Sequence, residues 1–221
     1  KTMCWGTYDV RWVRPIHNIL AIYAGEILDF KIWHFTANNK IKGHRYLGAG
    51  ELEVKNFANY RQALLSNGVE ICSMKRAEQI VLELDRQART LDCSLLEDLD
   101  LLEEVSGLVE YPKVMLGHIE DEFMSLPEDV LVTVMKKHQR YFALLQKDGN
   151  IAPYFLFVSN ISGTKDAEIV FGNEKVLNAR LSDAKFFYNS DNEQRLEDRT
   201  KLLASITFHK DIGNMLEKSQ N

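Results

Sequence analysis

The segment that most constrains the fold is the run Tyr-Phe-Leu-Phe-Val at residues 154–158, which is apolar at every position. A strand with one exposed face alternates apolar and polar residues, so this run predicts a central strand covered on both faces. An apolar segment at residues 141–145 precedes it, and Asp148-Gly149 between the two is a typical hairpin turn. We therefore expect an antiparallel strand pair with other elements packed over each side.

Helical spacing of apolar residues predicts helices over residues 56–67, 73–91, 92–110, 125–140, 166–188 and 194–204. Ser73 and the pattern Ser125-Leu-Pro-Glu128 are expected to cap the starts of two of them. Short strands are expected within residues 10–33, 69–72 and 114–116, and a positively charged loop over residues 37–45. Helices mixed irregularly with strands favour an α+β fold with a mixed or antiparallel sheet.

Composition narrows the class of protein. With 45% hydrophobic and 27% charged residues, the chain resembles folded proteins rather than disordered ones. No apolar stretch approaches the ~20 residues that span a bilayer. The 27 basic and 32 acidic residues give a net charge of −5, which argues against a wholly basic surface but allows a local basic patch. Three widely spaced cysteines form no disulfide or zinc pattern, which fits a reducing cytoplasm.

A search for catalytic motifs finds no dinucleotide fingerprint, phosphate loop, zinc-protease helix or nucleophile elbow. His118 is the only histidine beside several carboxylates, and no second histidine follows four residues later. We therefore predict no catalytic residue and no metal ligand in this chain.

Cations and amides close to aromatic residues form a more informative pattern, because they suit RNA phosphates and unpaired bases. The candidate RNA-binding residues fall into three groups: Lys42, His44 and Arg45; Lys136, Lys137, Gln139, Arg140 and Tyr141; and Asn173, Lys175 and Arg180. Helix-end charge or ion pairing explains the second group equally simply. For the third, Asn173, Glu174 and Arg180 could instead hold the long helix on the sheet. Residues 92–110 carry seven acids and no base, so we expect them to avoid RNA.

Several motifs occur in one order along the chain: Lys42-Gly-His-Arg45, Val109-Glu-Tyr-Pro112, His138-Gln-Arg-Tyr-Phe142, Gly172-Asn-Glu-Lys-Val176 and Ala179-Arg-Leu-Ser-Asp-Ala184. In these motifs the sequence resembles the β subunit of the bacterial heterotetrameric glycyl-tRNA synthetase. The resemblance runs over nearly the whole chain and implies a fragment from the N-terminal half of that subunit.

The resemblance implies a B3/B4-like α+β domain over residues 1–190, followed over residues 191–221 by a helical linker and the truncated start of an HD-like helical domain. It implies a cytoplasmic aminoacyl-tRNA synthetase in which the α subunit uses ATP and magnesium, while this fragment holds no cofactor. Expected partners are glycine tRNA, the α subunit and the remainder of the β subunit, with no membrane. The three candidate groups would contact the tRNA.

The sequence departs from the family pattern at three positions, and two alternative functions stay open. Cys4 and Lys42 stand where the family commonly has arginine, and Asn18 departs from the family's run after Pro15; lysine keeps the charge but loses bidentate geometry. One alternative function is an editing-like hydrolase of mischarged tRNA. The other is a purely structural interaction module that docks through the acidic segment 92–110.

Overall fold

The computed structural model describes residues 2–161, 163 and 165–220, and its fold is α+β, as the sequence predicts. Its centre is a four-stranded antiparallel sheet with the order β10-β12-β11-β9. The strands are β9 (Ser94–Leu95), β10 (Lys113–His118), β11 (Phe142–Leu145) and β12 (Ile151–Ser159). β12 pairs with β10 on one side and with β11 on the other. The predicted hairpin and the central place of residues 154–158 are therefore confirmed.

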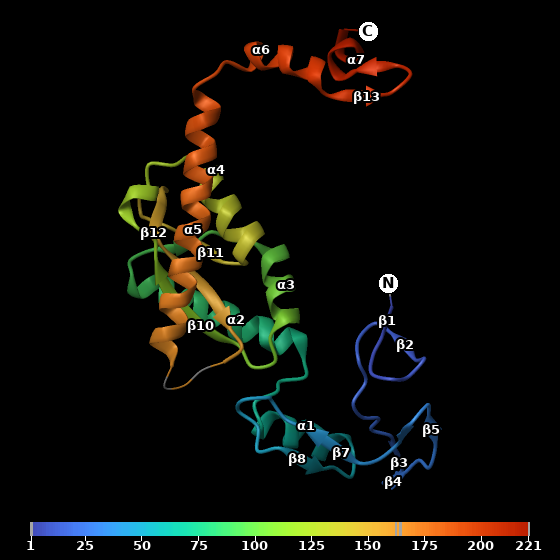
Figure 1. Cartoon of the computed structure of the whole chain (residues 1–221). Coiled ribbons are helices and arrows are strands. Elements are labelled where there is room, and N and C mark those ends of the chain that lie inside the picture. Colours follow the sequence, from blue (N-terminus) through green and yellow to red (C-terminus); the bar gives the residue numbers. More distant parts are fainter. Residues whose placement is uncertain (1, 162, 164, 221) are drawn as a thin grey trace.

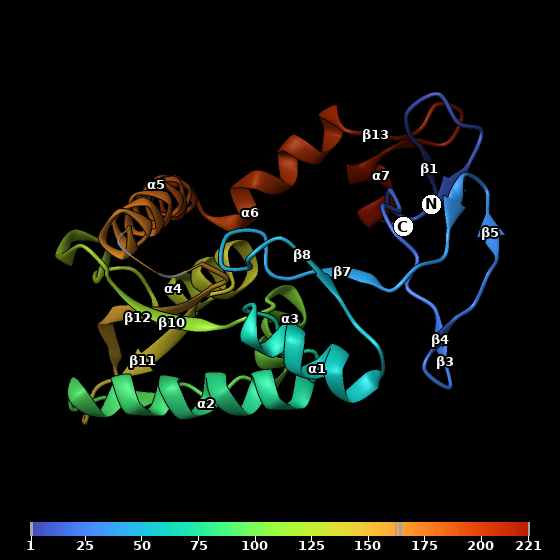
Figure 2. The ribbon, with the colours of Figure 1, turned by 90° about the horizontal axis from the view of Figure 1, so that it is seen from below.

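Helices cover both faces of this sheet, as Figure 2 shows for α2 and α5. Phe155 and Phe157 of β12 join one core with α5, whereas Ala152 and Leu156 join a second core with α2 and α3. This alternation is the physical reason why the strand is apolar throughout. The covering elements are α2 (Ser73–Thr90), α3 (Leu99–Leu108), η1 (Asp121–Phe123), α4 (Glu128–Thr133), the π-helical η2 (Val134–Gln139) and α5 (Asp166–Asn192).

Residues before α2 form short hairpins and a separate small core, built on Ile41, Val54 and Leu64. The elements are β1 (Met3–Cys4), β2 (Arg11–Trp12), β3 (Ile22–Tyr23), β4 (Glu26–Ile27), β5 (Lys31–Ile32), β6 (Phe35–Thr36), β7 (Lys40–Lys42), β8 (Glu51–Glu53) and α1 (Phe57–Ser66). Bonds connect the segment after this core with α2 and with the end of α3. The Glu70 N–H donates to Glu110 O at 2.9 Å, and Arg76 on α2 donates through Nη1 to Glu70 O at 2.6 Å and through Nε to Ser106 O at 2.8 Å.

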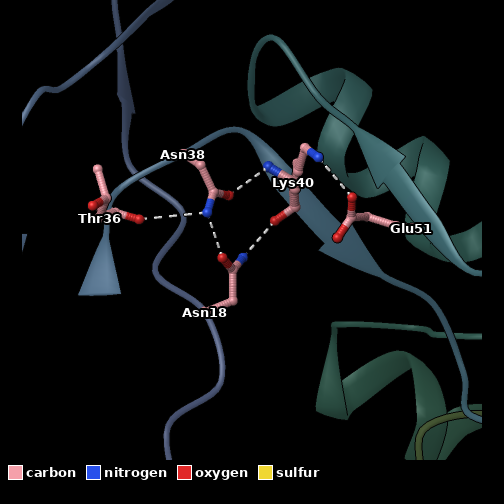
Figure 3. A network of polar contacts seen from close by, with 5 residues as sticks. All are labelled: Asn18, Thr36, Asn38, Lys40 and Glu51. Atoms are coloured by element: carbon pink, nitrogen blue, oxygen red, sulfur yellow. Dashed lines mark hydrogen bonds and ion pairs between the residues drawn. The ribbon is translucent and has the colours of Figure 1, made fainter. Parts of the chain in front are cut away.

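The charged loop expected over residues 37–45 is partly wrong, because β7 lies inside it. Figure 3 shows the contacts that hold this strand. Asn18 Nδ2 donates to Lys40 O and Asn38 Nδ2 to Asn18 Oδ1, both at 2.6 Å, while Asn38 Oδ1 accepts from the Lys40 N–H at 2.8 Å. The Lys40 ammonium also pairs with Glu51 on β8 at 2.8 Å. β7 thus pairs with β8, and two asparagine side chains bond the backbone groups of Lys40 as well.

The C-terminal part begins where α5 extends past the sheet (Figure 1). It contains α6 (Leu196–Arg199), η3 (Thr200–Ser205), β13 (Thr207–His209), β14 (Gly213–Asn214) and α7 (Met215–Gln220). The single helix predicted over 194–204 is wrong, because a short α-helix and a 3₁₀ segment replace it. Among the described residues after Leu181 none is buried, so no core supports a longer helix there.

Several predicted element ends also differ. Ser73 is the first residue of α2 rather than its cap, and the Ser125 hydroxyl donates to Glu122 O instead of capping α4. The helix predicted over 92–110 begins only at Leu99, because the Asp98 carboxylate accepts from the Leu101 N–H and caps it there, and it ends before Pro112. The strand expected over 69–72 is absent from the described structure.

Candidate nucleic-acid interface

The first candidate group lies on β7 and the turn after it. Lys42 and Arg45 are exposed, and the Arg45 guanidinium lies 5.7 Å from the centre of the Tyr46 ring. His44 is only 2% exposed, and its Nδ1 accepts from the N–H groups of Tyr46 and Leu47, both at 3.2 Å. His44 therefore shapes the turn, while Lys42 and Arg45 are the members of this group that reach solvent.

The second group lies on η2 and directly after it, beside the acidic helix α3. Lys136 pairs with Asp98 at 2.5 Å, and Arg140 Nε donates to Glu104 at 2.8 Å. The hydrogen bond to Asp98 raises the pKa of Lys136. Burial raises the pKa of Asp98, but the hydrogen bonds from Lys136 and the Leu101 N–H outweigh it and leave that pKa lowered. Carboxylates of the acidic segment 92–110 therefore neutralise part of the basic cluster.

Lys137 differs from its neighbours in this second group. Its side chain is exposed, and no carboxylate in the described part of the chain forms an ion pair with it. An unpaired ammonium can approach a phosphate without first breaking an internal contact. Lys137 is therefore the cation of the second group that is most available to RNA.

Tyr141, the last member of the second group, is buried and faces the third group. Its hydroxyl donates to Asn173 Oδ1 at 2.6 Å, and Asn173 Nδ2 donates to Ile169 O at 2.7 Å. The Tyr141 ring stacks on Phe155 with centroids 4.6 Å apart. Burial raises the pKa of Tyr141 to about 12, so its hydroxyl remains protonated at neutral pH.

The third group is divided between two sides of α5. Asn173 and Arg180 are seven residues apart, about two helical turns, and lie on one side, whereas Lys175 lies on another. Lys175 and Arg180 are both exposed. Glu174 accepts from the His118 N–H at 2.8 Å, so Asn173 and Glu174 do hold the long helix on the sheet region. No such bond is found for Arg180 among the described residues.

A cavity of about 200 Å³ joins the second and third groups. The polar residues that line it are Gln139, Arg140, Tyr141 and Asn173. Its apolar walls come from the end of α3 and the residue after it, Val105, Leu108 and Val109, and from Phe157 and Val158 of β12. Sequence analysis missed these walls, although the helical spacing of Val105, Leu108 and Val109 was visible. The first group lies close by, because His44 Nε2 is 3.9 Å from Glu110, the residue after Val109.

Gln139 is the polar residue of this cavity whose side chain is not engaged. The amide of Asn173 is occupied by Tyr141 and Ile169, and the Arg140 guanidinium by Glu104. For the Gln139 amide no partner is found within the described residues. A free amide offers one acceptor and two donor hydrogens, which is the pattern that reads the edge of a nucleobase.

Within residues 2–161, 163 and 165–220, no group of three or more histidine, cysteine or acidic side chains is arranged to hold a metal ion. None of the helices in that part combines the length and apolar character that crossing a bilayer requires.

Comparison with known proteins identifies the family. The family model described as "Glycyl-tRNA synthetase beta subunit" matches residues 1–221. The glycine–tRNA ligase beta subunit of Rickettsia akari (strain Hartford) is 46% identical over 221 residues, which are 100% of this chain and 33% of that protein. That of Rickettsia canadensis (strain McKiel) is 47% identical over 218 residues, or 99% and 33%. The chain belongs to the glycyl-tRNA synthetase beta-subunit family and spans about a third of the length of these relatives.

Proposed function

We propose that this chain is a tRNA-binding region of a cytoplasmic glycine–tRNA ligase, without chemistry of its own. In this proposal the α subunit uses ATP and magnesium to attach glycine, and the present chain helps to hold glycine tRNA for that reaction. Its partners are glycine tRNA, the α subunit and the rest of the β subunit. Family membership supports the ligase, and the cavity supports the binding role.

The observation that carries the binding role is the free amide of Gln139 in a cavity with apolar walls, beside the unpaired ammonium of Lys137. Apolar walls suit the faces of a base, the amide suits its edge, and the ammonium suits the adjoining phosphate. At about 200 Å³ the cavity is smaller than the typical 300–1,000 Å³ of small-molecule sites. A single unpaired base therefore fits it better than a larger free ligand.

The editing-like alternative receives less support from the same cavity. Its described lining contains no serine, cysteine, histidine or carboxylate that could attack an ester or activate water. The Tyr141 hydroxyl is held as a donor to Asn173, and its pKa of about 12 keeps it from acting as a base. The arrangement supports binding rather than hydrolysis.

The experiment is binding of glycine tRNA to the wild-type chain and to Gln139→Ala, with release of amino acid from mischarged tRNA measured in parallel. The variant should bind roughly tenfold more weakly, because a base loses its hydrogen-bond partner. Gln79→Ala, an exposed glutamine on α2, is the matched control and should bind as wild type. Equal binding by Gln139→Ala would refute the base-binding role, and release of amino acid would favour the hydrolase.

A further inference from the structure

A second hollow lies between α2, α3 and the edge strand β9. Its lining is apolar and acidic, whereas the candidate RNA-binding groups contain cations and amides. This α2–α3 groove has a volume of about 380 Å³. Its floor is apolar and fully buried, with Leu84 and Phe142 each 1% exposed. Its mouth is apolar too, but open: Val81 is 38% exposed and Leu99 78% exposed. Apolar surface therefore continues from the core to the solvent.

The mouth of the groove carries acidic residues beside these apolar ones. Asp85, Glu97 and Asp98 line it, and no basic residue does. Asp85 pairs with Arg89 at 3.0 Å, and Asp98 with Lys136 at 2.5 Å.

Two carboxylates remain to be placed: Glu97, which lines the mouth, and Glu103 on α3, which does not line it. Glu97 is exposed, and Glu103 is exposed one turn after Leu99 on the same side of α3. Neither forms an ion pair with another described residue. The groove thus combines an apolar slot with two uncompensated negative charges.

We propose that the α2–α3 groove binds a basic amphipathic protein segment, which inserts an apolar side chain and places lysine or arginine beside Glu97 and Glu103. Charge complementarity selects this occupant. RNA phosphates would be repelled by the same carboxylates, and a neutral apolar segment would leave them unpaired. The proposal is independent of the tRNA-binding role, because it uses the opposite charge and different residues.

The probe for this proposal is a synthetic helical peptide of about 14 residues, with leucines on one face and lysines flanking them. A second peptide keeps the leucines and replaces the lysines with glutamates. Fluorescence anisotropy of each labelled peptide is measured against the wild-type chain at low and at physiological salt. The lysine peptide should bind, more tightly at low salt, and the glutamate peptide should not.

Two variants test the location. Leu99→Ser should weaken binding of the lysine peptide roughly tenfold, because one large apolar contact is lost. The double variant Glu97→Lys, Glu103→Lys should weaken it by a similar factor and remove most of the salt dependence. All three positions are exposed, and circular dichroism checks that the fold is kept. The matched control Glu78→Lys, Glu193→Lys changes the net charge equally at exposed sites that do not line the groove and should bind as wild type.

Several results would overturn the proposal. These are equal binding of the two peptides, binding unchanged by Leu99→Ser or by the double variant, and no binding of the lysine peptide at low salt. A wild-type dimer in light scattering that Leu99→Ser converts to a monomer would also overturn it, since the occupant would then be a second copy of the chain.

Discussion

Replacing Tyr141 by phenylalanine isolates the hydrogen bond that joins the basic cluster to α5. The hydroxyl donates to Asn173 Oδ1 at 2.6 Å, and Tyr141 is 5% exposed. Tyr141→Phe keeps the ring stacked on Phe155 but leaves the Asn173 oxygen without its donor. A partly buried acceptor that loses its partner costs about 1–2 kcal/mol, so the free energy of unfolding should fall by that amount.

The assay is urea unfolding followed by far-ultraviolet circular dichroism. The three tryptophans, Trp5, Trp12 and Trp33, all lie in the N-terminal hairpin region, so their fluorescence does not report on the central sheet. A double-mutant cycle with Asn173→Ala should give a coupling of about 1 kcal/mol.

Tyr154→Phe is the matched control for this cycle. Its hydroxyl has no hydrogen-bond partner among the residues that the structure describes, so this variant should leave stability unchanged. A loss below about 0.3 kcal/mol for Tyr141→Phe, or additive single variants, would refute the assigned contact.

Three further predictions concern stability. Burial raises the pKa of Tyr141 to about 12 from 10, so the unfolded chain loses its proton first. Wild type should therefore lose roughly 2 kcal/mol of unfolding free energy relative to Tyr141→Phe as the pH rises from 10 to 12, in urea titrations at each pH. Gly117→Ala should destabilise the fold by about 1–3 kcal/mol, because the new Cβ would overlap the buried Phe155 ring. Gly107→Ala, in open space on α3, should instead stabilise the fold by about 0.5–1 kcal/mol. Equal melting temperatures for the two variants would contradict this prediction. His44→Ala should cost about 1–3 kcal/mol in urea unfolding, because two backbone N–H groups lose their acceptor; an unchanged midpoint would exclude it.

The central sheet was predictable because its signal is local and strong. An apolar run after an Asp-Gly turn defines a covered hairpin strand, and α2 and α5 follow from apolar spacing in their own sequences. β7 was not predictable, because the strand is defined by its pairing with β8 and by a bond from Asn18, about twenty residues away in the chain, and neither contact is visible in the local sequence. The C-terminal helix was overextended because periodicity predicts an apolar face but not the core that would cover it.

The candidate site was predictable by residue type but not by arrangement. The second and third groups meet at one cavity because Tyr141 and Asn173 come from elements that pack together only in the folded chain. The sequence patterns of the second and third groups, taken separately, do not predict this contact between Tyr141 and Asn173. Nor did they show that Asp98 and Glu104 neutralise Lys136 and Arg140, since those ion pairs span more than thirty residues of sequence.

The most direct test of the account is the salt dependence of glycine-tRNA binding by wild type and by Lys137→Ala. Lys137 is exposed and unpaired within the described part, so the variant breaks no ion pair there. Lys75→Ala, an exposed lysine on α2, is the control. The account predicts that Lys137→Ala alone reduces the slope of log affinity against log salt by about one. Equal slopes for all three proteins, or no tRNA binding at low salt, would contradict it.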